Sequence, residues 1–328
     1  MTNIIKYLSL LLLAYLLTGC NSKQYYKPDS VDGSFTKHSK SLSSTIVDFN
    51  KSGATLANMQ FITPNGIVEN KVGNDFTFIN QVKNITLSAD NNSNIAIDNK
   101  IIKLDNNIIS ASIDNNLLAI IYIDNSIAVY DLNRSKTIFK EQFSQALAND
   151  TKTTNPKFMS DIILFPTLDG KVIIYSINDN SIIRDVIVDA SKKAFKNITF
   201  FEEVDEQLIA ATANSVLSIG ANLYSLNLEI KDIATKNNQI YIATVDGRIL
   251  VMDNKLKPYN EQKFKFSKIF GLAFGENSLY ALEQNGYIIK MSNDLKDVSV
   301  YSFDYNNEDK FISLGNRFYF GNKYLELE

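Results

Sequence analysis

One repeating pattern of short apolar runs occupies most of this chain and restricts the folds open to it. From residue 42 to the end, runs of 4–8 residues rich in Ile, Val, Tyr and Phe alternate with turns rich in Asn, Asp, Gly and Ser. Runs of this length and composition are typical of β-strands. No window of 12 or more residues beyond residue 41 has helical periodicity, and the most helix-like stretch, 141–149, is short. The sequence therefore predicts an all-β protein.

Eight turns share one motif, in which an Asp or Asn is followed three residues later by an apolar residue. The clearest copies begin at Asp169, Asp246 and Asn285, each followed directly by Gly. The chain has 38 Asn against 13 Gly, and Asn tolerates the left-handed backbone of tight turns nearly as well as Gly does. The apolar residues of the eight copies are Val68, Ile101, Ile127, Val172, Leu217, Ile249, Ile288 and Leu325.

The spacing of these turns indicates the architecture. Successive copies are 26 to 45 residues apart and average about 37, starting at Asn65. A strand-only repeat of this size is typical of a propeller blade with four antiparallel strands. The alternative, a pair of two-sheet sandwiches, would not keep a common period through the chain. We therefore predict a seven- or eight-bladed β-propeller of four-stranded antiparallel blades.

The two ends of the repeat region predict how the ring closes. After the last turn, at Asn322, only residues 323–328 remain, so the last blade lacks an outer strand. The strand-like segment Ser44–Phe49 is free at the start of the domain. Because pairing would satisfy two exposed strand edges, we expect this N-terminal strand to complete the last blade.

The N-terminus has the features of a targeting segment. Lys6 precedes an apolar run, 7–17, that is too short to span a bilayer. The run ends in Leu17-Thr18-Gly19-Cys20, which resembles the lipobox of bacterial lipoproteins. That resemblance implies cleavage before Cys20 and lipidation of Cys20, including palmitate. The residue after it is Asn21 rather than Asp, which in the enteric pattern resembles the signal for sorting to the outer membrane. The alternative is an ordinary signal peptide that happens to end in Cys.

These features divide the chain into three parts. Residues 1–19 are predicted to be a lipoprotein signal peptide, and residues 42–328 the propeller domain. Between them, residues 20–41 are polar and without periodicity, so we expect a flexible, lipid-anchored tether. The predicted location is the bacterial cell envelope, at the outer membrane facing the periplasm, with the membrane contacted through the lipidated N-terminus.

The turn-and-strand units resemble the quinoprotein-like (PQQ-repeat-like) propeller repeat. Together with the lipobox and tether, they are similar to the BamB family of outer-membrane assembly lipoproteins. Repeats of this kind commonly contain a Trp that docks between blades, whereas this chain has none. Phe139, Phe264 and Phe303 lie near the positions where that aromatic residue would be.

The composition leaves little room for known catalytic chemistry. His38 is the single His and Cys20 the single Cys, so His/Cys catalysis, structural zinc and disulfides have almost no residues to use. No phosphate-binding loop or Gly-x-Ser-x-Gly motif is present, and no stretch matches a calcium loop. With 33 basic against 36 acidic residues, nucleic acid is not an expected partner. We expect no catalytic residues, metal or cofactor.

Two functions from different classes remain. The first is a scaffold that binds other envelope proteins through its loops, with the outer-membrane β-barrel insertase as the partner that the resemblance implies. The expected contact residues are charged and aromatic, because such side chains dominate many interfaces: Arg134, Lys136, Lys255, Lys257 and Tyr259. The alternative is a periplasmic ligand- or metal-dependent enzyme or sensor that uses the central channel.

Overall fold

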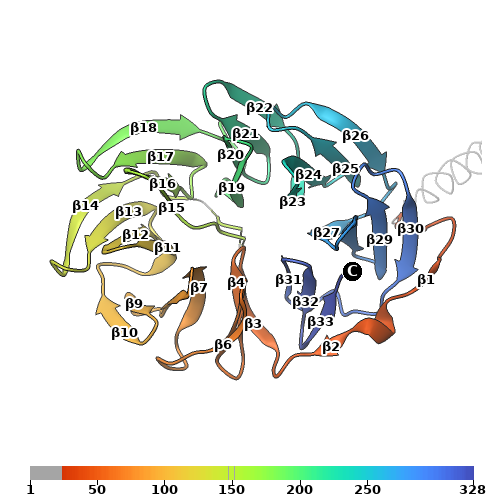
Figure 1. Ribbon diagram of the computed structural model, residues 1–328, viewed down its shortest axis with the longest axis horizontal. Coiled ribbons are helices and arrows are strands. Elements are labelled where there is room, and N and C mark those ends of the chain that lie inside the picture. Colours follow the sequence, from red (N-terminus) through yellow and green to blue (C-terminus); the bar gives the residue numbers. More distant parts are fainter. Residues whose placement is uncertain (1–23, 147, 151) are drawn as a thin grey trace, which may run out of the picture.

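The computed structural model describes residues 24–146, 148–150 and 152–328 of this chain. Within them, eight four-stranded units surround a central channel, so the fold is an eight-bladed β-propeller (Figure 1). This confirms the predicted fold class and settles the number of blades. The described residues contain one short 3-10 helix, η1 (Thr36–His38), and no helix long and apolar enough to cross a bilayer. The lipobox residues Leu17, Thr18, Gly19 and Cys20 lie outside the described residues.

The blades follow one another along the chain, and in each the first strand is the innermost. Blades 1 and 2 consist of β3 (Ile46–Asn50), β4 (Gly53–Leu56), β5 (Gln60–Thr63) and β6 (Gly66–Glu69), then β7 (Thr77–Val82), β8 (Ile85–Ala89), β9 (Asn94–Ile97) and β10 (Lys100–Lys103). Blades 3 and 4 consist of β11 (Ile108–Asp114), β12 (Leu117–Tyr122), β13 (Ser126–Asp131) and β14 (Lys136–Gln142), then β15 (Lys157–Met159), β16 (Ile162–Pro166), β17 (Lys171–Ser176) and β18 (Ser181–Ile187).

The second half of the ring repeats this arrangement. Blades 5 and 6 consist of β19 (Phe200–Val204), β20 (Gln207–Ala211), β21 (Ser215–Ile219) and β22 (Leu223–Asn227), then β23 (Ile230–Lys236), β24 (Gln239–Thr244), β25 (Arg248–Met252) and β26 (Pro258–Lys263). Blades 7 and 8 consist of β27 (Ile269–Phe274), β28 (Ser278–Glu283), β29 (Tyr287–Ser292) and β30 (Val298–Ser302), then β31 (Phe311–Leu314), β32 (Arg317–Phe320) and β33 (Lys323–Glu326). β1 (Gly33–Ser34) and β2 (Lys40–Ser41) add one strand each to blades 7 and 8.

Strand alternation gives the disc two distinct faces. Face 1 carries the turns that join the first to the second strand and the third to the fourth. Face 2 carries the turns between the second and third strands and every connection from one blade to the next. All residues in a given class of turn therefore lie on the same face, which positions the sites described below.

The eight predicted turn copies fall one in each blade, but not all at the same turn. Six lie between the second and third strands, and their apolar residues, such as Val172 and Ile249, are fully buried between blades. The copies at Asn65 and Asp98 lie between the third and fourth strands, so Ile101 is on an outer strand and 51% exposed. In blade 3 Asn125 takes the place of Gly, with φ +63°, in agreement with the predicted use of Asn.

An N-terminal strand closes the ring, as predicted, but a different segment provides it. β2 pairs antiparallel with β33, and Lys40 Nζ lies 2.6 Å from a carboxylate oxygen of Glu326. The predicted segment, Ser44–Phe49, instead overlaps β3, the innermost strand of blade 1. The reason is burial: Ile46 is 3% exposed and needs an interior position, whereas Lys40 and Ser41 suit a solvent-facing outer strand.

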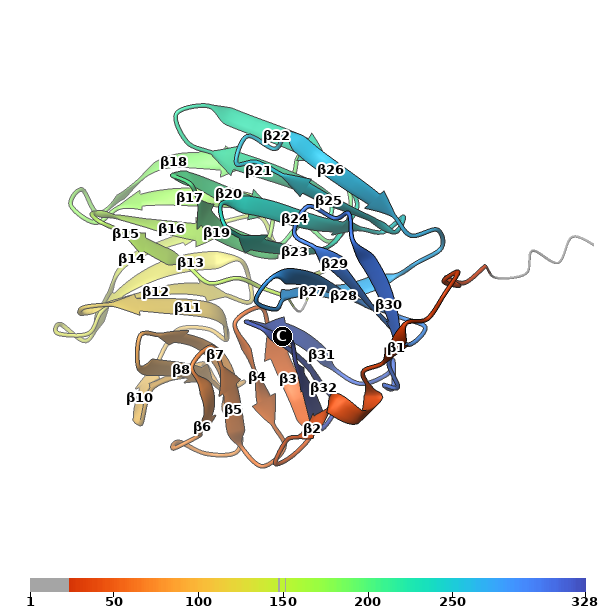
Figure 2. The same ribbon diagram turned by 45° about the vertical axis from the view of Figure 1, so that its right-hand side comes forward.

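The residues before β2 are not the free tether that their composition predicted. The described segment 24–41, here called the strap, runs along the outer edge of blades 7 and 8 (Figure 2). β1 pairs parallel with β30, and the Tyr26 ring packs edge-on against Phe264 and Tyr287 at centroid distances of 6.2 and 5.7 Å. Aromatic packing of this kind offsets the entropy lost on ordering the segment. The folded domain therefore includes residues 24–41.

Apolar side chains between adjacent blades form the core, and Phe and Tyr fill the interblade positions in this Trp-free chain. Phe303 at the end of blade 7 packs on Phe320 of blade 8 at 5.1 Å, and Phe139 of blade 3 packs on Tyr175 of blade 4 at 4.7 Å. Phe264 belongs to the cluster that joins blades 6 and 7. The three predicted docking aromatics are thus at blade junctions.

Candidate functional site

The central channel is lined by inner strands that share a local irregularity. In blades 1, 2, 3, 6 and 7 the inner strand has a β-bulge at the same place, after Ile46, Phe78, Ile108, Ile230 and Ile269. A bulge adds one unpaired residue and turns the strand locally. The residue that follows it is small or polar in every case, namely Asp48, Asn80, Ser110, Asp232 and Gly271. The channel wall is therefore polar at one level.

A segment of the chain itself crosses this channel. The connection from β14 to β15 is described at 143–146, 148–150 and 152–156, and it enters the centre of the ring (Figure 1). Asn155 accepts a hydrogen bond from Ser110 Oγ at 3.0 Å and donates one to Ser52 Oγ at 2.8 Å. Thr154 Oγ1 donates to the carbonyl of Ile198 at 3.1 Å. The segment thus joins blades 1 and 3 to the start of blade 5.

Asp232 is the charged centre of the channel. Its carboxylate lies 2.9 Å from Lys51 Nζ of blade 1 and 3.5 Å from Lys152 Nζ of the crossing segment. It also accepts hydrogen bonds from the Leu272 amide at 2.8 Å and from Ser313 Oγ at 3.4 Å. Burial alone would raise the pKa of Asp232, but the two ammonium groups lower it to about 2. This group therefore ties blades 1, 6, 7 and 8 to the crossing segment.

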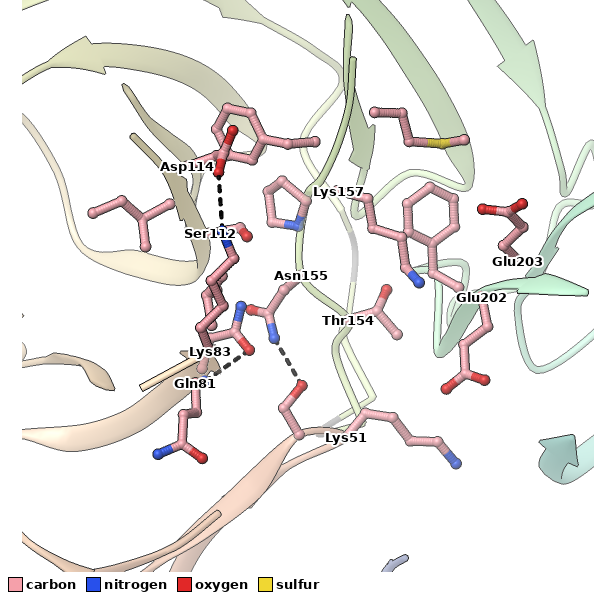
Figure 3. A pocket seen from close by; sticks show the side chains of 18 of the residues that line it. Lys51, Gln81, Lys83, Ser112, Asp114, Thr154, Asn155, Lys157, Glu202 and Glu203 are labelled. Carbon is pink, nitrogen blue, oxygen red and sulfur yellow. Dashed lines mark hydrogen bonds and ion pairs between the residues drawn. The ribbon is translucent and has the colours of Figure 1, made fainter. Parts of the chain in front are cut away.

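A polar cavity of about 720 Å³ opens at the face 1 end of the channel (Figure 3). Lys157 points into it beside Glu202 and Glu203. Burial lowers the pKa of Lys157, and the two carboxylates oppose that shift. Gln81 also lines the cavity, and its Oε1 atom is buried with no hydrogen-bond partner among the described residues. The cavity offers both donors and acceptors to a polar ligand.

The face 2 end of the channel has a different character. A cavity of about 670 Å³ there is lined by four Phe residues together with charged ones, and the Phe residues are Phe49, Phe195, Phe270 and Phe311. Phe195 is 50% exposed and Val245, also in its lining, is 44% exposed. Every exposed large apolar residue that lies in a described turn or interblade connection is on this face: Met59, Ile123, Phe195, Val245 and Phe266.

Metal-ligating side chains do not cluster at either mouth in the part of the ring that the structure describes. Across the part of the chain that the structure describes, no three His, Cys, Asp or Glu side chains gather closely enough to hold a metal ion. His38, in η1, packs against the Phe35 ring at 5.8 Å on the outer edge of the disc.

The structure divides the predicted contact residues between two distant blades. Arg134 and Lys136 lie at the outer turn of blade 3, and Lys255, Lys257 and Tyr259 at the outer turn and outer strand of blade 6. All five are exposed and near face 1, but blades 4 and 5 lie between the two groups, so they do not form one site. Arg134 is 3.6 Å from Asp131, and the amides of Lys255 and Lys257 donate hydrogen bonds to Asp253, so these residues also take part in the local structure of their turns.

Sequence reasoning missed the channel centre and the apolar face. Asp232 is the one acidic residue in β23 and stands between the buried Ile230 and Ile233, and a carboxylate at such a position is the signal that could have found it. The crossing segment is an unusually long connection, and its described residues contain no helix although 141–149 had the most helical pattern. The face 2 residues are single apolar side chains in turns, which become a group only through the ring.

Comparison with known proteins gives relatives in sequence and in fold. No family model matches the chain. It is 27% identical over 98% of its length to plasminogen-binding protein PgbB from two strains of Helicobacter pylori, covering 71% and 70% of those proteins. Among solved structures it is similar to BamB from Moraxella catarrhalis (TM-score 0.63, 12% identity, 88% of this chain and 99% of that one) and to the C-terminal WD40 domain of Sif2 (TM-score 0.63, 11% identity, 90% and 100%). At this identity the structural likeness concerns the fold alone.

Proposed function

We propose that this chain is a protein-binding scaffold of the bacterial cell envelope that holds its partner on face 2. The observation that carries the proposal is the restriction of exposed apolar turn residues to that face, around a channel mouth lined with Phe. Phe195 and Val245 line the same cavity at this mouth with Phe49, Phe270 and Phe311, and apolar side chains gathered in this way mark interaction sites. The channel itself is crossed by residues of the chain, which supports surface recognition rather than chemistry in a pore.

The relatives suggest which partners to test. The sequence relatives are named for plasminogen binding and align over nearly the whole chain, so plasminogen is the first proposed ligand. The likeness to BamB concerns the fold, and the outer-membrane β-barrel insertase is the second ligand to test. Both are proteins, in agreement with a scaffold, and the names of these relatives describe no enzymatic activity.

The test compares two pairs of substitutions with matched exposure. Phe195→Ser with Val245→Ser removes side chains that are 50% and 44% exposed on face 2, and Ile183→Ser with Leu223→Ser removes side chains that are 59% and 47% exposed on outer strands. We expect the face 2 pair to weaken binding to immobilised plasminogen or to purified insertase about tenfold or more, because buried anchors dominate interfaces. The outer-strand pair should leave binding unchanged.

A third variant, Lys255→Ala with Lys257→Ala and Tyr259→Ala, tests the rim residues that the sequence predicted. Loss of binding in this variant alone would move the interface to face 1. Equal binding by all variants would overturn a protein-binding role for either face. Thermal unfolding of each purified variant, compared with the unsubstituted chain, shows that lost binding is not lost folding.

The envelope anchor is proposed at Cys20. Cys20→Ser should remove lipidation and release the protein into the soluble envelope fraction, because it is the single thiol in the chain. Mass spectrometry and membrane fractionation measure the two effects. An unchanged mass and unchanged membrane association would contradict the anchor.

A small-ligand sensor is a second candidate, favoured by the face 1 cavity. Gln81 Oε1, which has no partner among the described residues, and the partly buried amine of Lys157 are polar groups that a ligand could satisfy. Screening polar metabolites by thermal shift, with Lys157→Met as the comparison, tests this candidate. A stabilising compound should lose its effect in the variant, and a screen without such a compound would remove the candidate.

A further inference from the structure

The strap determines how far the disc can lie from a membrane anchor. Tyr26 is 9% exposed and fixed between Phe264 and Tyr287, at the face 2 margin of blades 6 and 7. Cys20 precedes it by six residues. An extended chain gains at most about 3.3–3.6 Å per residue, so an anchor at Cys20 would hold this margin within about 20 Å of the lipid headgroups.

A groove lies at the place where the chain leaves the disc. Its volume is about 620 Å³, and it is formed by the strap together with the blade 6 to blade 7 connection and β30. Three of its lining residues are exposed apolar side chains, Tyr25 at 61%, Phe266 at 40% and Val298 at 38%. Lys27 and Lys265 also line it and are exposed, and Lys268 follows in the same connection.

Acidic residues lie near the groove as well as basic ones. Asp246 pairs with Lys263 at 2.8 Å, and Asp32 accepts the amide of Val300 at 2.8 Å while keeping its charge. Asp29 and Asp32 therefore face Lys27 and Lys265 in the lining, with Lys268 next to it in the same connection. Lys265 Nζ lies 4.9 Å from the centre of the Phe266 ring. Phe266 has φ +64°, an uncommon conformation for a bulky residue that keeps its ring at the surface. Aromatic rings beside lysines are the combination found at membrane interfaces.

We propose that this groove seats on the surface of an anionic phospholipid bilayer, so that the disc stands with the edge of blades 6 and 7 toward the membrane. The orientation rests on the anchor proposed above. The acyl chains on Cys20 limit the distance between the disc and the membrane. The groove adds an electrostatic and aromatic contact that sets the angle between the disc and the membrane surface. In this position both faces of the disc stay open at the opposite edge, where protein partners can approach.

The test uses the chain from residue 20 onward with Cys20→Ser, which retains every described residue and has no lipid. Sedimentation with phosphatidylcholine vesicles, with and without phosphatidylglycerol, measures binding. We expect binding to the anionic vesicles and at least about 25-fold weaker binding after Lys27→Gln, Lys265→Gln and Phe266→Asn, since each of the two lysines contributes about fivefold. Asn is used at position 266 because it tolerates positive φ.

The matched control lies on the opposite side of the ring. Lys100→Gln, Ile101→Ala and Lys103→Gln change two exposed lysines and an exposed apolar residue on β10 of blade 2, and this variant should bind as the unsubstituted chain does. Equal loss in both variants, or equal binding to neutral and anionic vesicles, would overturn the proposal.

A second measurement does not depend on affinity. Because the chain contains no Trp, Tyr25→Trp and Ile101→Trp each introduce a single fluorescent reporter. Emission of the reporter at position 25 should shift to the blue on anionic vesicles, and that at position 101 should not. The reverse result would place another surface on the membrane. If the chain without groove substitutions binds plasminogen but not anionic vesicles, this orientation is refuted and the scaffold proposal stands.

Discussion

The same eight blades build both faces of the disc, yet the two faces expose different side chains. Face 1 turns are polar pairs such as Asn115-Asn116 and Asn237-Asn238, whereas face 2 turns expose Ile123, Val245 and Phe195. Turns need residues that tolerate strained backbone, and polar residues meet that need without loss of solubility. Apolar side chains in turns add nothing to the core. Their presence on one face is the reason for placing the proposed partner there.

The two mouths of the channel differ as the faces do: the mouth on face 1 is polar and the mouth on face 2 is apolar. Lys157, Glu202 and Glu203 surround the face 1 mouth, and Phe49, Phe270 and Phe311 line the face 2 mouth. The crossing segment and Asp232 keep the two apart. Substitutions at the channel centre, at the strap and at the face 1 rim show how much each region contributes to the free energy of unfolding.

The largest effect is expected from Asp232→Ala. Removal of the carboxylate leaves Lys51 and Lys152 partly buried without their shared anion, which typically costs about 3–5 kcal/mol of unfolding free energy. The crossing segment should loosen as well. Urea unfolding measures the first effect and amide hydrogen exchange at 148–156 the second. A variant as stable as the unsubstituted chain would show that Asp232 does not join the blades.

A smaller loss is expected from Tyr26→Ala, which tests the side of the disc where the strap is attached. The substitution removes two edge-on aromatic contacts and a buried ring, at a cost of about 2–3 kcal/mol. The strap should then become sensitive to limited proteolysis near residues 24–32, while blades 1–5 stay protected. Tyr25→Ala, next to it and 61% exposed, is the matched control and should change neither property.

The pH dependence of stability should reveal the same buried carboxylate. Asp232 has a native pKa of about 2, below its ordinary value of 3.8, so its contribution is present above about pH 4 and is lost as the pH falls toward 2. The loss should be about 2 kcal/mol. Asp232→Asn should be less stable at neutral pH, and its stability should approach that of the unsubstituted chain near pH 2. Parallel curves for the two proteins would contradict the assignment.

The smallest effect is expected at the face 1 rim, from Asp114→Asn. Its carboxylate is 3.9 Å from Lys83, whose side chain is 84% exposed, and pairs of this kind contribute little. We expect a change in unfolding free energy below about 0.5 kcal/mol. A loss comparable to that of Asp232→Ala would show that the face 1 mouth is held by charge as firmly as the channel centre.

The fold could be predicted because its signals are local and repeated. Apolar runs, Asp-Gly and Asn-containing turns and their spacing recur in every blade, and Val172 or Ile249 are buried wherever the turn joins second and third strands. Asn65 and Asp98 lie at a different turn from the other six copies. The sequence could not distinguish the two turns, because both hairpins of a blade have similar sequences. Local pattern also could not assign Lys40–Ser41 to blade 8, since two residues carry too little signal.

The candidate site was less predictable because it exists only after the ring forms. Asp232, Lys51 and Lys152 are far apart in sequence, and none stands in a motif. Lys255 and Arg134 were plausible contact residues as loop charges, but the ring places them three blades apart. The flexible tether was predicted from the polar composition of the strap. That composition fits its exposed residues, but it gives no sign that the ring of Tyr26 is buried.

The closure of blade 8 has a consequence for folding kinetics. The ion pair between Lys40 and Glu326 joins residues 286 positions apart, whereas the strands of blades 1 to 6 pair with near neighbours. Blades can therefore form in succession as the chain emerges, but the ring stays open until the last strand has arrived. Closing so long a loop is costly in entropy, which makes this contact the expected rate-limiting step. During that interval β2 has no partner strand, so the N-terminal segment has an unpaired edge that other chains or chaperones can bind.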